Sequence, residues 1–207
     1  DADNNIVEAS VGGTNGSFRY NSANQMVWSK KAIGEQTVDE RFYLYDGLDC
    51  IAEVSPAGLV YREFMRVGNV GGVVAEFVAI DPTVPTGDYS TVNYYHYNHR
   101  GDVIAVTRNS QVIFEADYDA YGTMIWSSGD FKPRYTFSTK RSFEDFGAYY
   151  YGYRWYLPEL GRWMQKDLSE INSDGLNAYA FCRNRPTGAV DGFGLVSDDE
   201  LINNFGE

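Results

Sequence analysis

The sequence has few of the residues that build metal centres and disulfide frameworks. It holds two cysteines, Cys50 and Cys182, and two histidines, His96 and His99, among 207 residues. Two cysteines so far apart form no zinc motif and no disulfide framework; unless the fold brings them together, we expect two buried free thiols. A histidine-rich metal site is excluded, and a Ser–His–Asp triad would need one of the two histidines. We therefore expect no metal and no cofactor.

Basic residues are also in the minority. The chain has 17 Lys and Arg against 29 Asp and Glu, a net charge of −12. Nucleic-acid-binding proteins normally present a basic face, so we expect no nucleic-acid partner. The acidity favours solubility and would suit a basic guest, while a simply solvated acidic surface remains the alternative.

Long apolar runs are absent too. No stretch approaches the roughly 18 apolar residues that span a bilayer, and no signal peptide is evident, so we expect no membrane span. Because the chain begins at Asp1 without a Met, we expect a fragment or processed piece of something longer.

Aromatic residues and glycine are plentiful. The chain contains 17 Tyr, 12 Phe and 21 Gly. Tyr and Phe favour pleated, half-buried surfaces, and Gly marks tight turns. This mixture predicts an all-β chain with many hairpins.

An aromatic–polar signature recurs along the first part of the chain. Its key tyrosines are each followed by Asn or Asp, which suits a turn, and the recurrence of about 20–26 residues fits a stacked strand–turn–strand unit. The tyrosines are Tyr20, Tyr45, Tyr97 and Tyr118. Hairpins are predicted over 103–117, with its tip at Arg108–Gln111, and over 59–80, around Gly71-Gly72. Residues 1–16 and 81–93 are expected to be loops.

A denser aromatic stretch follows, and it carries a recognisable motif. The segments are YTFSTKRSFEDFGAYYYGYRWYLPELGRWMQKD (135–167), DGLNAYAFCRNRP (174–186) and AVDGFGL (189–195). In order and spacing they resemble the Rhs repeat-associated core of Rhs/YD-repeat proteins. Teneurins and the C components of ABC toxin complexes share this shell architecture.

The resemblance implies a fold. YD repeats wind stacked antiparallel β-hairpins into a β-shell, and the core segment spirals inward as a plug. We therefore expect YD-repeat-like hairpins over 1–134, the Rhs core over 135–195, and the start of a variable C-terminal extension over 196–207. The predicted hairpins are too few to enclose a toxin domain. We therefore expect this chain to be either the closing end of a larger shell or a reduced shell whose interior is filled by its own aromatic side chains.

The resemblance also implies a function. Shells of this family enclose a C-terminal toxin or effector, and the core is an aspartic autoprotease that cuts after the final Gly-Leu. The expected partners are the chain's own C-terminal extension or toxin domain, the rest of a longer shell, and a secretion-system component. The expected location is exported or cell-surface associated.

The chemistry of such a site needs two carboxylates, which the motif supplies as Asp167 and Asp191. One carboxylate activates water while the other, protonated, donates to the carbonyl or leaving group. The scissile bond would be Leu195–Val196, close enough to Asp191 for attack within one chain. Arg162 could hold a carboxylate or stabilise the developing oxyanion.

Other interpretations stay open. Asp167 and Asp191 could be turn residues that accept backbone N–H bonds, and Arg162 a structural ion-pair partner. Leu168 and Gly192 stand where the family has proline, which leaves the autoprotease either active or inactive. The alternative function is a structural or adhesive β-shell with an inactive protease, binding a partner or glycan through exposed aromatics. An independent glycan-active enzyme is a third, weaker candidate.

Overall fold

The structure, a computed structural model, describes residues 1, 3–67, 72–79, 89–167, 177–189 and 191–194. Its strands β1 to β11 form one antiparallel sheet in which every strand pairs with the next along the chain. The bounds are β1 Glu8–Val11, β2 Thr14–Tyr20, β3 Met26–Ile33, β4 Gln36–Asp46, β5 Asp49–Val54, β6 Val60–Val67, β7 Gly72–Ala79, β8 Tyr89–Tyr97, β9 Val103–Arg108, β10 Gln111–Tyr118 and β11 Met124–Ser128. The prediction of an all-β chain of antiparallel hairpins is confirmed.

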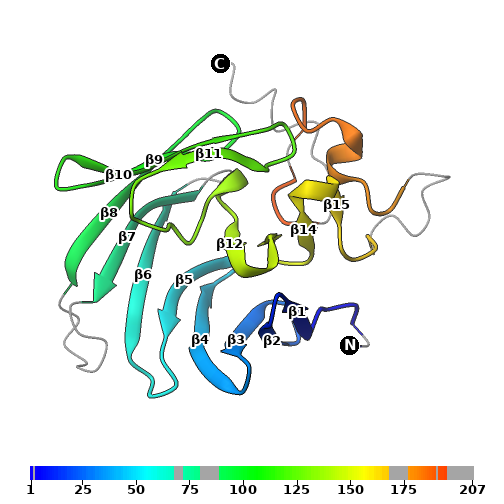
Figure 1. Cartoon of the computed structure of the whole chain (residues 1–207), viewed down its shortest axis with the longest axis horizontal. Coiled ribbons are helices and arrows are strands. Elements are labelled where there is room, and N and C mark those ends of the chain that lie inside the picture. Colours follow the sequence, from blue (N-terminus) through cyan, green and yellow to red (C-terminus); the bar gives the residue numbers. More distant parts are fainter. Residues whose placement is uncertain (2, 68–71, 80–88, 168–176, 190, 195–207) are drawn as a thin grey trace.

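A second, smaller sheet follows in the chain. Its four antiparallel strands are joined by short 3₁₀ turns and also pair in chain order. The strands are β12 Arg141–Phe143, β13 Ala148–Tyr150, β14 Trp155–Leu157 and β15 Arg162–Trp163; the 3₁₀ turns are η1 Phe137–Thr139, η2 Glu144–Phe146, η3 Pro158–Leu160 and η4 Phe181–Asn184. The large sheet curves strongly, and β12, β14 and β15 lie on its concave side (Figure 1).

Three of the predicted turns are separate five-residue loops with the same hydrogen-bond pattern. The Asp119 Oδ1 accepts hydrogen bonds from the N–H groups of Tyr121 and Thr123, both at 2.9 Å. Gly122 in the same loop has a φ of +90°, which glycine adopts without strain. The amide oxygens of Asn21 and Asn98 make the same pair of contacts. At these three turns the Asn or Asp after the tyrosine therefore closes the loop with its own side chain.

The tyrosines before these turns tie each strand to the strand before it. Each of the four key tyrosines lies at or next to the end of a strand, as the repeat predicts. Three of them donate a hydrogen bond to a main-chain carbonyl at or just before the start of the preceding strand: Tyr20 to Ile6, Tyr45 to Met26 and Tyr118 to Val103, at 2.8–3.0 Å.

The hairpin predictions hold, and two loop predictions are wrong. Strands β9 and β10 form the hairpin expected over 103–117, and β6 and β7 form the one over 59–80. The predicted leading loop over 1–16 instead contains β1 and the start of β2, because a polar edge strand carries no alternating apolar pattern. The predicted loop over 81–93 overlaps β8, which begins at Tyr89.

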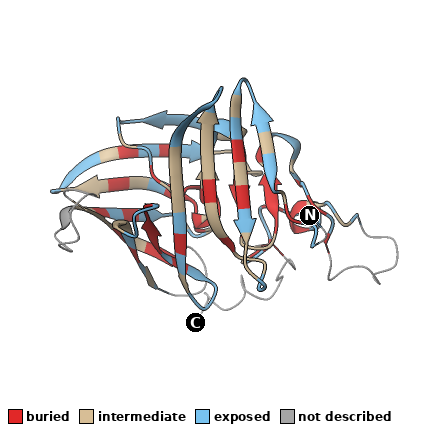
Figure 2. Ribbon diagram, turned by 90° about the horizontal axis from the view of Figure 1, so that it is seen from below, coloured by how far each residue is buried: buried red, intermediate tan, exposed pale blue. Residues whose placement is uncertain are grey.

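The core lies between the concave face of the large sheet and the segment that follows it. Phe64 of β6 packs edge-on against Tyr135, with ring centroids 4.9 Å apart. Phe18 of β2 packs in the same way against Trp155 of β14, at 4.7 Å. Buried positions alternate with less buried ones in β2 and β10, and buried, intermediate and exposed residues are interspersed along most strands of the large sheet (Figure 2). The residues before and after position 134 thus share their hydrophobic clusters.

Cys50 and Cys182 are both buried thiols that form no disulfide, as predicted. Among the described residues, no cluster of three or more His, Cys, Asp or Glu side chains is placed to hold a metal ion. Within that same part of the chain, no helix is long and apolar enough to cross a membrane.

Candidate functional site

The site is built around Arg154, which lies in the tight turn between β13 and β14. The N–H of Tyr151 donates to the carbonyl of Arg154 at 3.0 Å, and Gly152 takes a φ of +110° to close the turn. The Arg154 side chain points into the core, where its guanidinium lies 4.1 Å from the ring centroid of Trp163. Only 4 % of Arg154 is exposed, so its charge must be balanced inside the protein.

Two buried carboxylates balance that charge. The Arg154 Nη2 lies 2.8 Å from Oδ2 of Asp167 and 3.3 Å from Oδ2 of Asp191. Both aspartates are 3 % exposed. The structure therefore brings together the two aspartates that the sequence predicts, and one guanidinium nitrogen joins them.

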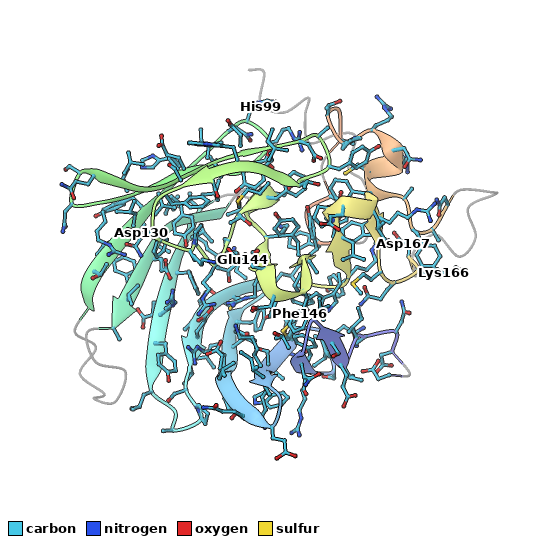
Figure 3. The ribbon with its side chains drawn as sticks, viewed as in Figure 1. His99, Asp130, Glu144, Phe146, Lys166 and Asp167 are labelled. Atoms are coloured by element: carbon cyan, nitrogen blue, oxygen red, sulfur yellow. The ribbon has the colours of Figure 1, made fainter. Side chains whose placement is uncertain are left out.

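Asp167 follows β15, and its backbone is held by a hydrogen bond to a residue later in the chain. Its N–H donates to the carbonyl of Ala178 at 3.0 Å. The same carbonyl lies 3.5 Å from Nη1 of Arg154. The labelled Asp167 lies beside β15 and at the end of the described part of this segment (Figure 3). Leu168, the residue that replaces the family's proline, lies outside the described residues.

Asp191 forms a turn with its own side chain. Its Oδ1 accepts the N–H of Phe193 at 3.2 Å and that of Gly194 at 2.6 Å. The turn forms although Gly192 stands where the family has proline, because the carboxylate supplies the constraint that a proline ring would give. One carboxylate oxygen of Asp191 therefore accepts the backbone N–H bonds expected of a turn residue. The other contacts Arg154, as expected of a residue in a catalytic pair.

The chain is held just before the predicted scissile bond. The Arg154 Nε–H donates to the carbonyl of Gly194, and the N–H of Tyr153 donates to that of Phe193 at 3.2 Å. Gly194 has a φ of +78°, and a Cβ there would lie 3.2 Å from the Tyr151 Cβ. The predicted bond between Leu195 and Val196, and the predicted extension over 196–207, lie outside the described residues.

Arg162 does not join this group. It is exposed on β15, where it pairs with Leu157 of β14 and bridges to Ala180. The carboxylate contact that we expected of Arg162 is made by Arg154. The sequence contains a partial signal: Arg154 lies inside the aromatic run 149–156, and an arginine in such a run is buried only when paired, although the run does not identify the partner.

Lys140, which lies between η1 and β12, is close to the turn formed by Asp191. Its Nζ lies 5.4 Å from the ring centroid of Tyr151 and 5.8 Å from that of Phe193. Burial and the nearby charge of Arg66 together lower the pKa of Lys140 to about 8, against the opposing effect of the Asp191 carboxylate. A small hollow of about 70 Å³ next to Phe193 is lined by Lys140 and Arg66.

The arrangement places two carboxylates, one guanidinium and a fixed segment of main chain together. Two carboxylates lie within reach of one guanidinium, and the approaching main chain is fixed by the same arginine. A carboxylate pair can activate water and donate a proton, and a guanidinium can stabilise a developing oxyanion.

Comparison with known proteins gives relatives in bacterial toxins. No protein-family model matches the chain. Toxin subunit YenC2 of Yersinia entomophaga is 32 % identical over 199 residues, which cover 89 % of this chain and 20 % of the relative. The tRNA nuclease WapA of Bacillus subtilis is 34 % identical over 106 residues, 47 % of this chain and 4 % of the relative. The chain therefore spans only a small part of these proteins.

Solved structures show the same fold. The crystal structure of TcdB2-TccC3-Cdc42 matches 92 % of this chain and 9 % of its own, with a TM-score of 0.68 and 22 % identity. The Photorhabdus luminescens Tc holotoxin pore matches 93 % of this chain and 9 % of its own, with a TM-score of 0.67 and 21 % identity. The sequence relatives and the shared fold lead to one conclusion: the chain is homologous to the Rhs/YD-repeat shell proteins.

Proposed function

We propose that this chain closes an Rhs-type β-shell around a C-terminal toxin or effector and cleaves itself after Leu195. In this proposal Asp167 and Asp191 form the carboxylate pair of an intramolecular aspartic protease. The segment over 135–195 acts as the plug, the hairpins over 1–134 as wall, and the residues from 196 on as the start of the released part. The shell would belong to a larger exported or cell-surface toxin assembly, in which the rest of the shell and a secretion-system component are partners.

One observation carries the proposal. A single buried arginine, Arg154, contacts both aspartates and the carbonyl of Gly194, the residue before Leu195. Turn formation alone requires none of this convergence, because the backbone contacts of Asp191 already close its turn. Fixing the reacting chain beside the carboxylates provides the proximity that intramolecular cleavage needs.

Mass spectrometry of the purified chain tests the proposal. The wild type should break between Leu195 and Val196, while Asp167→Asn and Asp191→Asn should stay whole, because an amide neither activates water nor donates a proton as a carboxyl group does. Asp130→Asn is a suitable control because Asp130 is exposed and far along the chain from the site. A wild-type chain that stays intact after prolonged folding would rule out the active protease.

The structural alternative also has support. The guanidinium of Arg154 satisfies both carboxylates, which is the pattern of a buried ion-pair network as well. On the large sheet, Trp126 and Tyr94 are 51 % and 53 % exposed and could bind a partner or glycan. If the wild type does not cleave, this adhesive or structural shell is the remaining function.

A further inference from the structure

A pocket of about 230 Å³ lies on the concave side of the large sheet, well apart in sequence from the turn of Asp191. Its walls come from the inner faces of β3 and β4 and from the segment over 132–146. Glu144 and Phe146, which are among its lining residues, lie inside the curve of the sheet (Figure 3). We call it the inner pocket.

The inner pocket is cationic although the chain carries a net charge of −12. Five basic side chains line it: Lys31, Arg41, Lys132, Arg134 and Arg141. Three acidic side chains also line it, and each already has a basic partner, in the pairs Asp39–Arg41 at 2.7 Å, Asp145–Lys31 at 2.8 Å and Glu144–Lys132 at 3.0 Å.

Behind the lining of the inner pocket, the carboxylate of Glu53 lies close to four guanidinium groups. The fully buried Glu53 lies 2.6 Å from Arg141. Its other basic neighbours are Arg41, Arg62 and Arg134, each at 3.8 Å. Only Arg62 has a second buried carboxylate, that of Glu76. Positive charge therefore exceeds negative charge at the back of the pocket.

Arg134 is the group left least satisfied. Its Nε is buried and has no hydrogen-bond acceptor among the described residues, since 3.8 Å to Glu53 is beyond hydrogen-bond range. Its side chain is 32 % exposed and lines the pocket. A buried donor without an acceptor is costly, so an acceptor placed in the pocket would stabilise this arrangement.

We propose that the inner pocket binds an oxyanion, a carboxylate or a phosphate, through Arg134 with Arg141. Guanidinium groups present forked N–H donors that match the paired oxygens of these anions. The rings of Phe18, Tyr43 and Phe143 form other parts of the lining and favour a compact head group. The anion is either a free ion or an Asp or Glu side chain of a polypeptide inside the shell. This site does not depend on self-cleavage.

Calorimetric titration of the full chain with inorganic phosphate tests the free-ion form, with chloride at matched ionic strength as the reference. A second arm uses a terminally capped peptide that carries two Glu residues, with the Gln version of the peptide as its reference. Arg134→Gln should weaken binding at least about tenfold, since a forked contact to the anion is lost. Arg185→Gln, which removes the same charge from an exposed position, should bind as the wild type does.

Phosphate binding that Arg134→Gln weakens supports a free-ion site, and Glu-specific peptide binding that it weakens supports a side-chain site. If Arg134→Gln does not fold, as judged by near-ultraviolet circular dichroism, Lys31→Gln takes its place and should also weaken binding, since it leaves the carboxylate of Asp145 unpaired in the pocket. The proposal is overturned if neither probe binds beyond its reference, or if the pocket variant binds as tightly as the control.

Discussion

At the scale of single residues, Arg154 determines the chemistry of the candidate site. It supplies three different N–H groups to four acceptors: two carboxylates and the carbonyls of Gly194 and Ala178. Lysine, with one nitrogen on a flexible stem, cannot reach such a spread of acceptors. The positions of Asp167 and Asp191 thus depend on the shape of the guanidinium as well as on its charge.

Arg154→Lys therefore separates shape from charge. The variant keeps a cation beside the two aspartates, so we expect it to fold, but self-cleavage should slow about 100-fold because the fixed donors are lost. Time courses of fragment appearance on denaturing gels measure the rate. Arg162→Lys is the matched control, and it should cleave at the wild-type rate because Arg162 is exposed on β15. Equal rates in the two variants would argue against a role for Arg154.

The two glycines after Asp191 should differ in their tolerance of a side chain. Gly194 has a left-handed φ and contacts at 3.2–3.4 Å for an added Cβ, whereas nothing lies within 4 Å of a Cβ at Gly192. Gly194→Ala should destabilise the fold by about 1–2 kcal/mol and slow cleavage. Gly192→Ala should be neutral or stabilise it by about 0.5 kcal/mol. Urea unfolding measures the free energy of unfolding of both variants. A larger loss of stability in Gly192→Ala than in Gly194→Ala would contradict the prediction.

At the scale of elements, the sequence predicts the hairpins well because their signals are local. The Tyr–Asn/Asp pairs mark strand ends because the side chain of the turn residue closes a loop within the next four positions. The edge strand β1 could not be predicted, because its residues pair with β2 without burying an apolar face. Arg154 and Asp191 meet across 37 positions, and no local pattern specifies which arginine fills that role.

The five-residue loop around Asp119 predicts that removing its side-chain acceptor lowers the stability of the fold. Asp119→Ala removes the acceptor of two N–H groups, those of Tyr121 and Thr123, and should destabilise the fold by about 1–2 kcal/mol. Asp119→Asn should keep most of that stability, because its amide oxygen can accept the same bonds, as Asn21 and Asn98 do. Thermal unfolding resolves the difference. Asp117→Ala, at an exposed strand position nearby, is the control and should change little.

At the scale of the whole molecule, Glu53 joins the large sheet to the segment packed on its concave side. The carboxylate comes from β5, two of its arginine neighbours come from the sheet, and Arg134 and Arg141 come from the later segment. Burial alone would raise the pKa of Glu53, but Arg141, Arg134 and Arg62 outweigh burial and lower the pKa to about 2. The charge of one side chain thus couples the two layers.

This coupling predicts a specific acid sensitivity. Because the folded-state pKa is about 2 against an ordinary 4.5, the contribution of Glu53 is complete above about pH 4.5 and is lost as the pH falls toward 2. Glu53→Gln should cost about 3–5 kcal/mol at pH 7, since it leaves buried arginines uncompensated. Its deficit relative to the wild type should shrink between pH 4.5 and 2 in urea unfolding series. Glu63→Gln, at an exposed position on β6, should match the wild type throughout. A Glu53→Gln deficit that is constant across this range would show that the side chain contributes through packing, and that its charge does not hold the two layers together.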